Sequence, residues 1–170
     1  KENQSGKGTP SVPWGGAFLA DPGTSFGKYV NPNAHQLENL EDVRCLCLLG
    51  EPGIGKTQEL WTEKQRCEDK GFQTCWMKLR GYEPGLLQEK TSIKQWHSAG
   101  GNLYLFLDGL DEGRETIKNL GARLVETIRE WPKEGLYIRI TCRSGLWSSS
   151  LEEKLTGWWG KEELRTLELA

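Results

Sequence analysis

One eight-residue segment has the pattern of a phosphate-binding loop. It reads Gly-Glu-Pro-Gly-Ile-Gly-Lys-Thr over residues 50–57 and matches G-x-x-x-x-G-K-[ST] at every fixed position. Glycine lets the backbone approach phosphate oxygens and take positive φ, so that N–H groups can surround them. We expect Lys56 to reach the β- and γ-phosphates and the Thr57 hydroxyl to bind Mg²⁺. The predicted nucleotide-binding residues are Gly50, Glu51, Pro52, Gly53, Ile54, Gly55, Lys56, Thr57 and Gln58.

A second group of reactive side chains follows an apolar run about fifty residues further on. Leu103–Leu107 ends at Asp108, and Asp111 and Glu112 come directly after it. A carboxylate at the end of such a strand can hold Mg²⁺ through its water shell, which is the role predicted for Asp108. A neighbouring carboxylate can orient or deprotonate an attacking water; Glu112 is the first candidate and Asp111 the alternate. Either could instead only cap the next helix, whose first turn favours acids.

The elements that must position these residues alternate between strands and helices. Apolar runs and alternation predict strands over 43–49, 72–79, 103–107, 136–141 and 163–169. Helices are expected over 56–70, 84–98, 117–131 and 149–156, with a short one around 34–40. This alternation predicts an α/β fold of the P-loop NTPase type: a parallel five-stranded sheet flanked by helices in three α/β/α layers.

The order of the motifs also predicts how the strands are arranged. A helical segment and a strand separate the phosphate loop from the acidic strand end, which fits the P-loop classes with an extra strand between the two motif strands. That inserted strand would be Leu136–Thr141. Arg143 follows its carboxyl end and is expected to point toward the γ-phosphate, where it could sense or stabilise charge. The alternative is an ordinary surface arginine.

Three segments resemble the motifs of NACHT-type ATPases of the STAND class. These are the phosphate loop within 48–57, the acidic motif Leu-Phe-Leu-Asp-Gly-Leu-Asp-Glu at 105–112, and the strand Ile-Arg-Ile-Thr-Cys-Arg at 138–143. The acidic motif is the most distinguishing, since it has a small residue after the first Asp and then a paired Asp-Glu. The resemblance covers about residues 43–170, and the order of the motifs together with the arm over Phe18–Pro32 resembles bacterial members.

The resemblance implies a nucleotide switch inside a larger signalling or defence protein. Members of that family bind ATP or exchange it for ADP, open, self-associate, and hydrolyse slowly to reset. The implied cofactors are ATP and Mg²⁺, and the implied partners are copies of the chain and flanking domains. We expect an irregular arm over 1–42 and a NACHT-like core over 43–170 that stops before the helical lid, and therefore a piece of a longer protein that could hydrolyse weakly.

Composition excludes several other classes. The formal net charge is −2, which gives no general electrostatic case for nucleic-acid binding. No run of about 18 apolar residues marks a membrane span. The five cysteines form no C-x-x-C pair and are expected to be buried free thiols of a cytoplasmic protein.

Other readings of the phosphate loop stay open. The domain could hold ATP or ADP as a structural latch without turnover, or, less favoured, could be a small-molecule kinase, although no Arg-rich lid segment is seen. A GTPase is disfavoured because N-K-x-D is absent and residues 108–111 are not D-x-x-G. Tyr29, Val30 and Leu37 could hold the adenine, but the segment that carries them could equally cover a sheet edge.

Overall fold

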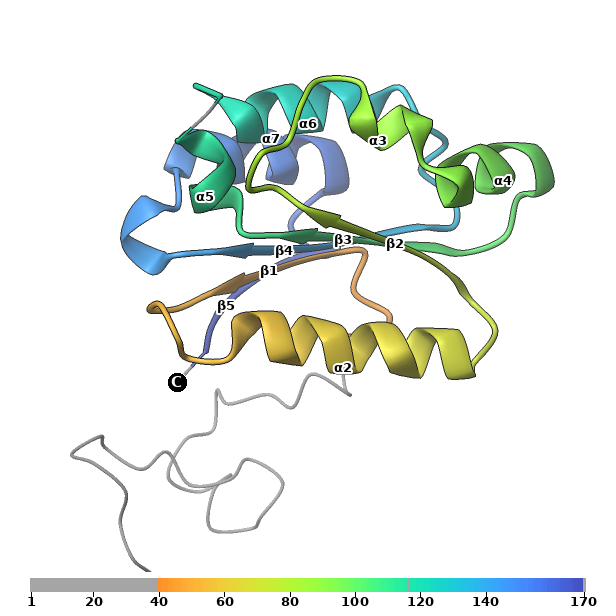
Figure 1. The fold of residues 1–170 in the computed structure, drawn as a ribbon, viewed down its shortest axis with the longest axis horizontal. Helices are drawn as coiled ribbons and strands as arrows, with labels where there is room; N and C mark the ends of the chain where they lie inside the picture. The colour runs from red at the N-terminus through yellow and green to blue at the C-terminus, as the bar shows by residue number, and fades with distance from the viewer. Residues whose placement is uncertain (1–39, 116, 170) are drawn as a thin grey trace, which may run out of the picture. The chain divides into compact units, whose positions relative to one another are not determined.

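A parallel sheet forms the centre of the fold. The computed structural model describes residues 40–115 and 117–169, and Figure 1 shows their arrangement. Within these ranges the sheet has five strands in the order β2-β3-β4-β1-β5, and every neighbouring pair is parallel. The strands are β1 (Cys45–Leu49), β2 (Gln73–Lys78), β3 (Leu103–Asp108), β4 (Leu136–Cys142) and β5 (Leu164–Glu168).

Helices cover both faces of this sheet. Helix α2 lies on one face, and the other described helices lie on the opposite face (Figure 1). They are α2 (Lys56–Asp69), α3 (Leu86–Glu89), α4 (Thr91–Ala99), α5 (Leu110–Arg114), α6 (Leu120–Arg129) and α7 (Ser149–Trp159). The predicted α/β class with three layers is confirmed. The inserted strand is confirmed too, because β4 lies between β3 and β1.

Two of the predicted helices are interrupted or begin later in the structure, and the helix expected over 149–156 extends to Trp159. The helix expected over 84–98 is two helices, because Lys90 is extended, with φ −62° and ψ 129°, between α3 and α4. The helix expected over 117–131 begins only at Leu120, because Asn119 takes a left-handed conformation with φ 59°. The separate α5 was not predicted. Apolar spacing continues across both breaks, which is why periodicity alone missed them.

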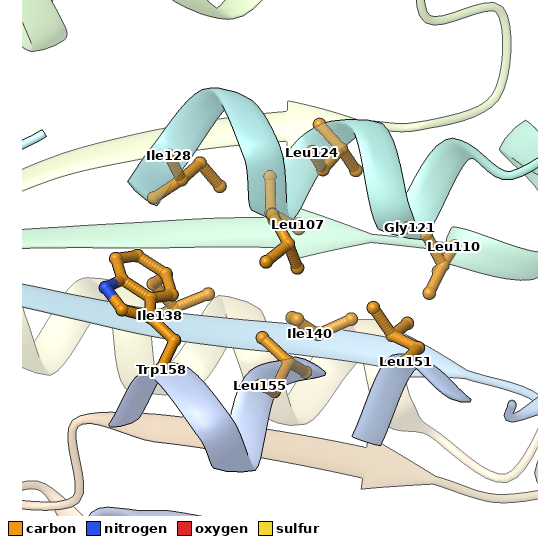
Figure 2. A pocket seen from close by; sticks show the side chains of 11 residues that line it. Leu107, Leu110, Gly121, Leu124, Ile128, Ile138, Ile140, Leu151, Leu155 and Trp158 are labelled. Carbon is orange, nitrogen blue, oxygen red and sulfur yellow. The ribbon is translucent and has the colours of Figure 1, made fainter. Parts of the chain in front are cut away.

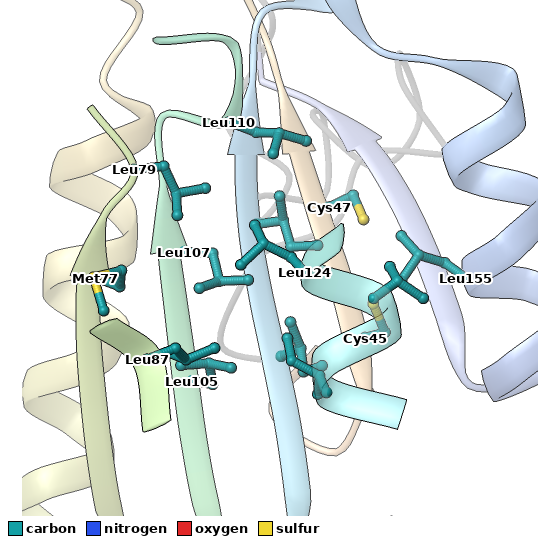
Figure 3. Close-up of a cluster of buried hydrophobic side chains, with 14 of the residues drawn as sticks. Cys45, Cys47, Met77, Leu79, Leu87, Leu105, Leu107, Leu110, Leu124 and Leu155 are labelled. Atoms are coloured by element: carbon teal, nitrogen blue, oxygen red, sulfur yellow. The ribbon is translucent and has the colours of Figure 1, made fainter. Parts of the chain in front are cut away.

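Two apolar clusters, one on each face, hold the layers together. Successive strand residues point to opposite faces, so β3 contributes Leu103, Leu105 and Leu107 to one cluster and Tyr104 and Phe106 to the other. Figure 3 shows the first cluster, which includes Leu110 of α5, Leu124 of α6 and Leu155 of α7. All six residues of β3 are buried, as expected for a central strand covered by helices on both faces.

The packing between α6 and α7 is nearly free of gaps. Apolar side chains such as Leu124, Ile128, Leu151 and Leu155 surround the small space between them and the sheet (Figure 2). It measures about 10 Å³, room for at most one water molecule, and its walls are apolar. This interior is therefore core rather than a ligand site.

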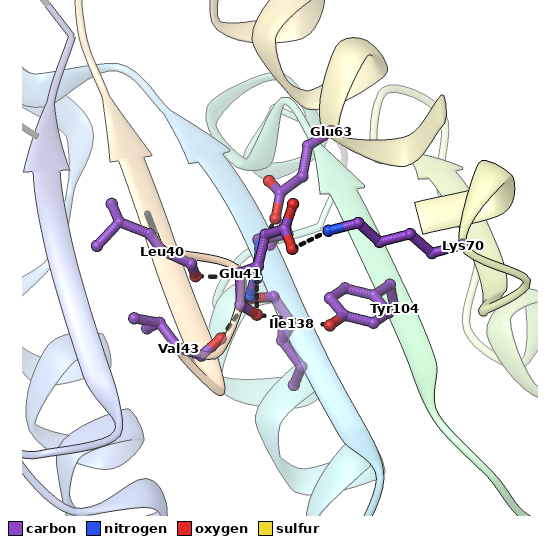
Figure 4. Close-up of polar contacts among 8 residues, drawn as sticks. Leu40, Glu41, Val43, Glu63, Lys70, Tyr104 and Ile138 are labelled. Atoms are coloured by element: carbon purple, nitrogen blue, oxygen red, sulfur yellow. Dashed lines mark hydrogen bonds and ion pairs between the residues drawn. The ribbon is translucent and has the colours of Figure 1, made fainter. Parts of the chain in front are cut away.

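A buried ion pair ties the second cluster to the start of β1. Arg139 of β4 and Glu63 of α2 are 0% and 1% exposed, and Arg139 Nε donates to Glu63 Oε1 at 2.5 Å. The guanidinium also donates to the carbonyl oxygens of Leu40, Glu41 and Val43 (Figure 4). Sheet, helix α2 and the chain entering β1 therefore meet at one arginine.

The remaining sequence expectations concern cysteines, metals and membranes. All five cysteines are free and buried, as predicted. Across residues 40–115 and 117–169 no group of three or more His, Cys, Asp and Glu residues could hold a metal ion by itself, and no helix is long and apolar enough to cross a membrane. The predicted arm over 1–42 and the short helix around 34–40 lie outside the described residues except for their last positions.

Candidate phosphate-binding site

The predicted phosphate loop joins the central strand β1 to helix α2. Gly53 and Gly55 have φ of 81° and 105°, a left-handed region that side chains disfavour. A Cβ atom at either position would meet nothing within 4 Å, so backbone conformation rather than crowding requires these glycines. The loop ends at the first turn of α2, whose N–H groups have no partner inside the helix and carry the positive end of its dipole. This geometry suits an anion.

Lys56 lies folded over the loop that precedes it. Its Nζ donates to the carbonyl oxygens of Gly50 at 2.7 Å and of Glu51 at 2.9 Å. These bonds hold the ammonium group against the loop, where it can exchange carbonyl partners for phosphate oxygens. The sequence prediction that Lys56 serves the phosphates is compatible with this position.

Thr57 and Asp108 meet although 51 positions separate them. The Thr57 hydroxyl donates to Asp108 Oδ1 at 3.0 Å and lies 3.2 Å from Oδ2. Thr57 starts α2 and Asp108 ends β3, so strand order brings the two motifs together. A hydroxyl beside a carboxylate offers the hard oxygen ligands that Mg²⁺ prefers. The donor set therefore fits the predicted metal.

Thr141, which the sequence analysis did not assign a role, completes this network. Its hydroxyl donates to Asp108 Oδ1 at 2.8 Å and accepts the backbone N–H of Gly109 at 2.8 Å. Thr141 lies in β4 directly beside the end of β3, and both Thr141 and Asp108 are buried. The one sequence signal was its position near the end of the inserted strand. It holds the carboxylate of Asp108 toward the loop.

Arg143 and Asp111 form an ion pair in the structure. Arg143 Nε lies 2.8 Å from Asp111 Oδ2, and the Arg143 backbone N–H donates to Asp111 Oδ1 at 3.2 Å. Asp111 is 8% exposed, so its charge is buried and matched by an arginine. The sequence does not predict this pairing: it indicates Asp111 as the alternate residue for orienting water, and Arg143 as pointing toward the γ-phosphate.

Glu112 differs from the other two acids at this end of the sheet. It lies in the first turn of α5 and is exposed, and its side chain has no hydrogen-bond or ion-pair partner among residues 40–115 and 117–169. A Cβ at Gly109 would lie 3.4 Å from the Glu112 carboxyl carbon, so the carboxylate folds back over the end of β3. Its oxygens remain available to water, as a general base requires.

A hollow of about 390 Å³ joins the predicted site residues. Most of the predicted residues line it, and Gly109 and Thr141 line it as well. The predicted residues that line it are Pro52, Gly53, Gly55, Lys56, Thr57, Gln58, Asp108, Asp111, Glu112 and Arg143. Gly50, Glu51 and Ile54 do not line it. Tyr29, Val30 and Leu37, the candidates for holding the adenine, lie outside the described residues.

Comparisons with known proteins add little to this geometry. No protein-family model matches the chain, and no curated protein matches it. Among solved structures, a structure of C. elegans PCH-2 is 19% identical with a TM-score of 0.44, and covers 79% of this chain and 38% of that one. The S. cerevisiae Hsp104–ADP complex is also 19% identical with a TM-score of 0.36, and covers 74% of this chain and 19% of that one. The chain spans about two fifths and one fifth of these two proteins.

Proposed function

We propose that this chain binds Mg²⁺–ATP and hydrolyses it slowly. The observation that carries the proposal is the meeting of Thr57 and Asp108 beneath the phosphate loop. Two motifs found separately in the sequence come within hydrogen-bond distance, which supports a shared role in holding a Mg²⁺–nucleotide. The Thr141 hydroxyl donates a further hydrogen bond to the same Asp108 carboxylate.

Each side chain then has a role that its position supports. The loop N–H groups and the first turn of α2 bind the phosphate chain, and Lys56 leaves its carbonyl partners for the β- and γ-phosphates. Thr57 and Asp108 would hold Mg²⁺, which would supply positive charge to offset that of the phosphates. Glu112 orients or deprotonates the attacking water, and Arg143 contacts charge on the terminal phosphate.

The NACHT-type resemblance extends this proposal to a switch in a larger protein. In that reading residues 43–170 are the nucleotide core, flanking domains close over the base, and exchange between ATP and ADP controls self-association. The acidic motif at 105–112 supports it most, because its last residue, Glu112, faces the hollow.

Calorimetry of Mg²⁺-dependent ATP binding tests the proposal. The intact chain should bind ATP only with Mg²⁺ present, and Lys56→Ala should abolish the heat of binding because the phosphates lose their cation. Lys64→Ala is the matched control: it removes the same charge from the same helix, where Lys64 pairs with Glu68. Binding that survives Lys56→Ala, or a folded intact chain that binds no ATP, would contradict the proposal.

A further inference from the structure

Asp111 holds both the backbone and the side chain of Arg143. One carboxylate oxygen accepts the Arg143 backbone N–H at 3.2 Å, and the other lies 2.8 Å from Nε. The Asp111 side chain is 6% exposed, whereas the Arg143 side chain is 45% exposed. A buried carboxylate therefore fixes the direction in which an otherwise solvent-facing arginine leaves the end of β4.

The pair leaves the phosphate-binding part of the guanidinium available. The 2.8 Å contact with Asp111 is at Nε, and neither terminal nitrogen of Arg143 donates a hydrogen bond within the described residues. Those nitrogens form the fork with which arginine recognises phosphate oxygens. Arg143 and Asp111 both line the 390 Å³ hollow, together with Lys56 and Glu112.

The same contacts make Asp111 a poor general base. Both of its oxygens are occupied, its charge is matched by a guanidinium, and it is shielded from water. Glu112, one residue further on, has none of these constraints. Asp111 and Glu112 therefore have different roles.

We propose that Asp111 is a positioning residue that acts through Arg143, and that the pair sets how strongly the site prefers a triphosphate over a diphosphate. The inference rests on the proposed function, since it needs a nucleotide in the hollow. A diphosphate lacks the terminal group that the fork would contact, so the preference for triphosphate depends on where the fork is held.

The measurement is the ratio of the Kd for Mg²⁺–ADP to the Kd for the non-hydrolysable triphosphate Mg²⁺–adenylyl imidodiphosphate. Arg143→Ala should lower this ratio about tenfold, the size expected for a charge-assisted contact. Asp111→Asn keeps the shape of the side chain and an oxygen for the backbone N–H, but loses the ion pair. It should lower the ratio about three- to fivefold, and the double variant should match Arg143→Ala because Asp111 acts only through Arg143.

Glu115→Gln is the matched control. Glu115 lines an adjoining hollow of about 250 Å³ with Asp111 and Arg143, so its replacement removes the same charge nearby without touching the pair. It should leave the ratio unchanged.

An unchanged or higher ratio in Asp111→Asn would overturn the inference. A further loss of hydrolysis when Asp111→Asn is added to Arg143→Ala would also overturn it, because that result is expected if Asp111 is a general base. An intact chain that binds neither nucleotide overturns the proposed function as well, whereas an intact chain that binds both, with a ratio insensitive to Asp111, overturns this inference alone.

Discussion

At the scale of single residues, the site depends on hydroxyl groups as much as on charges. Thr57 and Thr141 belong to different elements, and both donate to the same Asp108 oxygen. Each bond restricts the rotation of the carboxylate, so the oxygen that faces the loop stays in place before any metal arrives. Preorganisation of this kind avoids an ordering cost on binding.

Thr141→Val should weaken Mg²⁺-dependent ATP binding by about tenfold. The change keeps the branched shape but deletes a hydrogen bond to a charged group, worth about 1.5–3 kcal/mol, and leaves the Gly109 N–H without its acceptor. Calorimetry at fixed Mg²⁺ measures the effect. Thr166→Val is the control, because the Thr166 hydroxyl, on β5, donates to the carboxylate of Glu152 of α7 and not to Asp108. Wild-type affinity in Thr141→Val would show that Asp108 needs no support from β4.

Glu112→Gln should separate hydrolysis from binding. The amide keeps the size of the side chain but cannot take a proton, so we expect turnover to fall by about 10²-fold or more while ATP affinity stays near wild type. Phosphate release under single-turnover conditions is the measurement, with Glu115→Gln as the charge-matched control. If both variants hydrolyse ATP at the wild-type rate, the domain holds nucleotide without using this carboxylate, as the structural-latch reading expects.

At the scale of elements, Arg139 connects strand, helix and the chain leading into β1. Helix α2 carries Lys56 and Thr57 at its first turn and Glu63 in the middle of its length. The Arg139–Glu63 pair thus anchors the helix that presents the nucleotide ligands. The centroid of the Tyr104 ring lies 5.5 Å from the guanidinium carbon of Arg139. Lys70 forms an ion pair with Glu41, whose backbone carbonyl accepts a hydrogen bond from the same guanidinium (Figure 4).

Glu63→Gln should destabilise the fold strongly. It leaves the Arg139 charge buried without a partner, a change that typically costs about 3–5 kcal/mol. Urea unfolding followed by circular dichroism measures the loss. The double variant Glu63→Leu/Arg139→Met should recover only part of it, because the carbonyl oxygens of Leu40, Glu41 and Val43 lose their donor.

The exposed pair between Lys94 and Glu89 supplies the comparison for that experiment. Glu89→Gln breaks an ion pair of 2.8 Å between solvent-facing side chains, and we expect little change in the urea midpoint. An effect of Glu63→Gln no larger than that of Glu89→Gln would show that the buried pair does not anchor α2.

At the scale of the whole described structure, strand order decides where the chemistry lies. The neighbours β3, β4 and β1 are parallel, so their carboxyl ends meet at one edge of the sheet. The loop after β1, Asp108 at the end of β3, and Thr141 and Arg143 at the end of β4 all reach that edge. Ligand sites of open parallel sheets gather there for this reason.

The buried thiols give the fold a pH limit on the alkaline side. Burial raises the pKa of Cys142 to about 11 and that of Cys67 to about 12, from an ordinary value of 9.0. It also raises the pKa values of Cys47 and Cys75. In the unfolded chain these thiols ionise near the ordinary value, so between about pH 9 and 12 the unfolded state binds fewer protons than the native state.

Stability should therefore be constant with respect to these thiols below about pH 9 and fall steadily above it. Urea midpoints between about pH 7.5 and 10.5, in the presence of a reductant, test this. Cys67→Ala should lower the starting stability but make the alkaline decline shallower, because one proton-releasing group is gone. A midpoint that does not fall above about pH 9 would contradict the expectation.

Several features could be derived from the sequence because they are encoded locally. The glycine spacing of the phosphate loop and the apolar run that ends at Asp108 follow from patterns within a few residues, whereas the inserted strand was inferred from the order of the motifs along the chain. Glycine conformation and strand burial act over that range, so composition and spacing report them directly.

Other features were decided only by the tertiary structure. Thr141 meets Asp108, Asp111 meets Arg143, and Arg139 meets Glu63 across separations of 33, 32 and 76 positions. Which side chains meet over such separations depends on which strands become neighbours and in what register, and the packing of the whole core sets both. Local patterns identified the reactive residue types, but only the assembled sheet determined their partners.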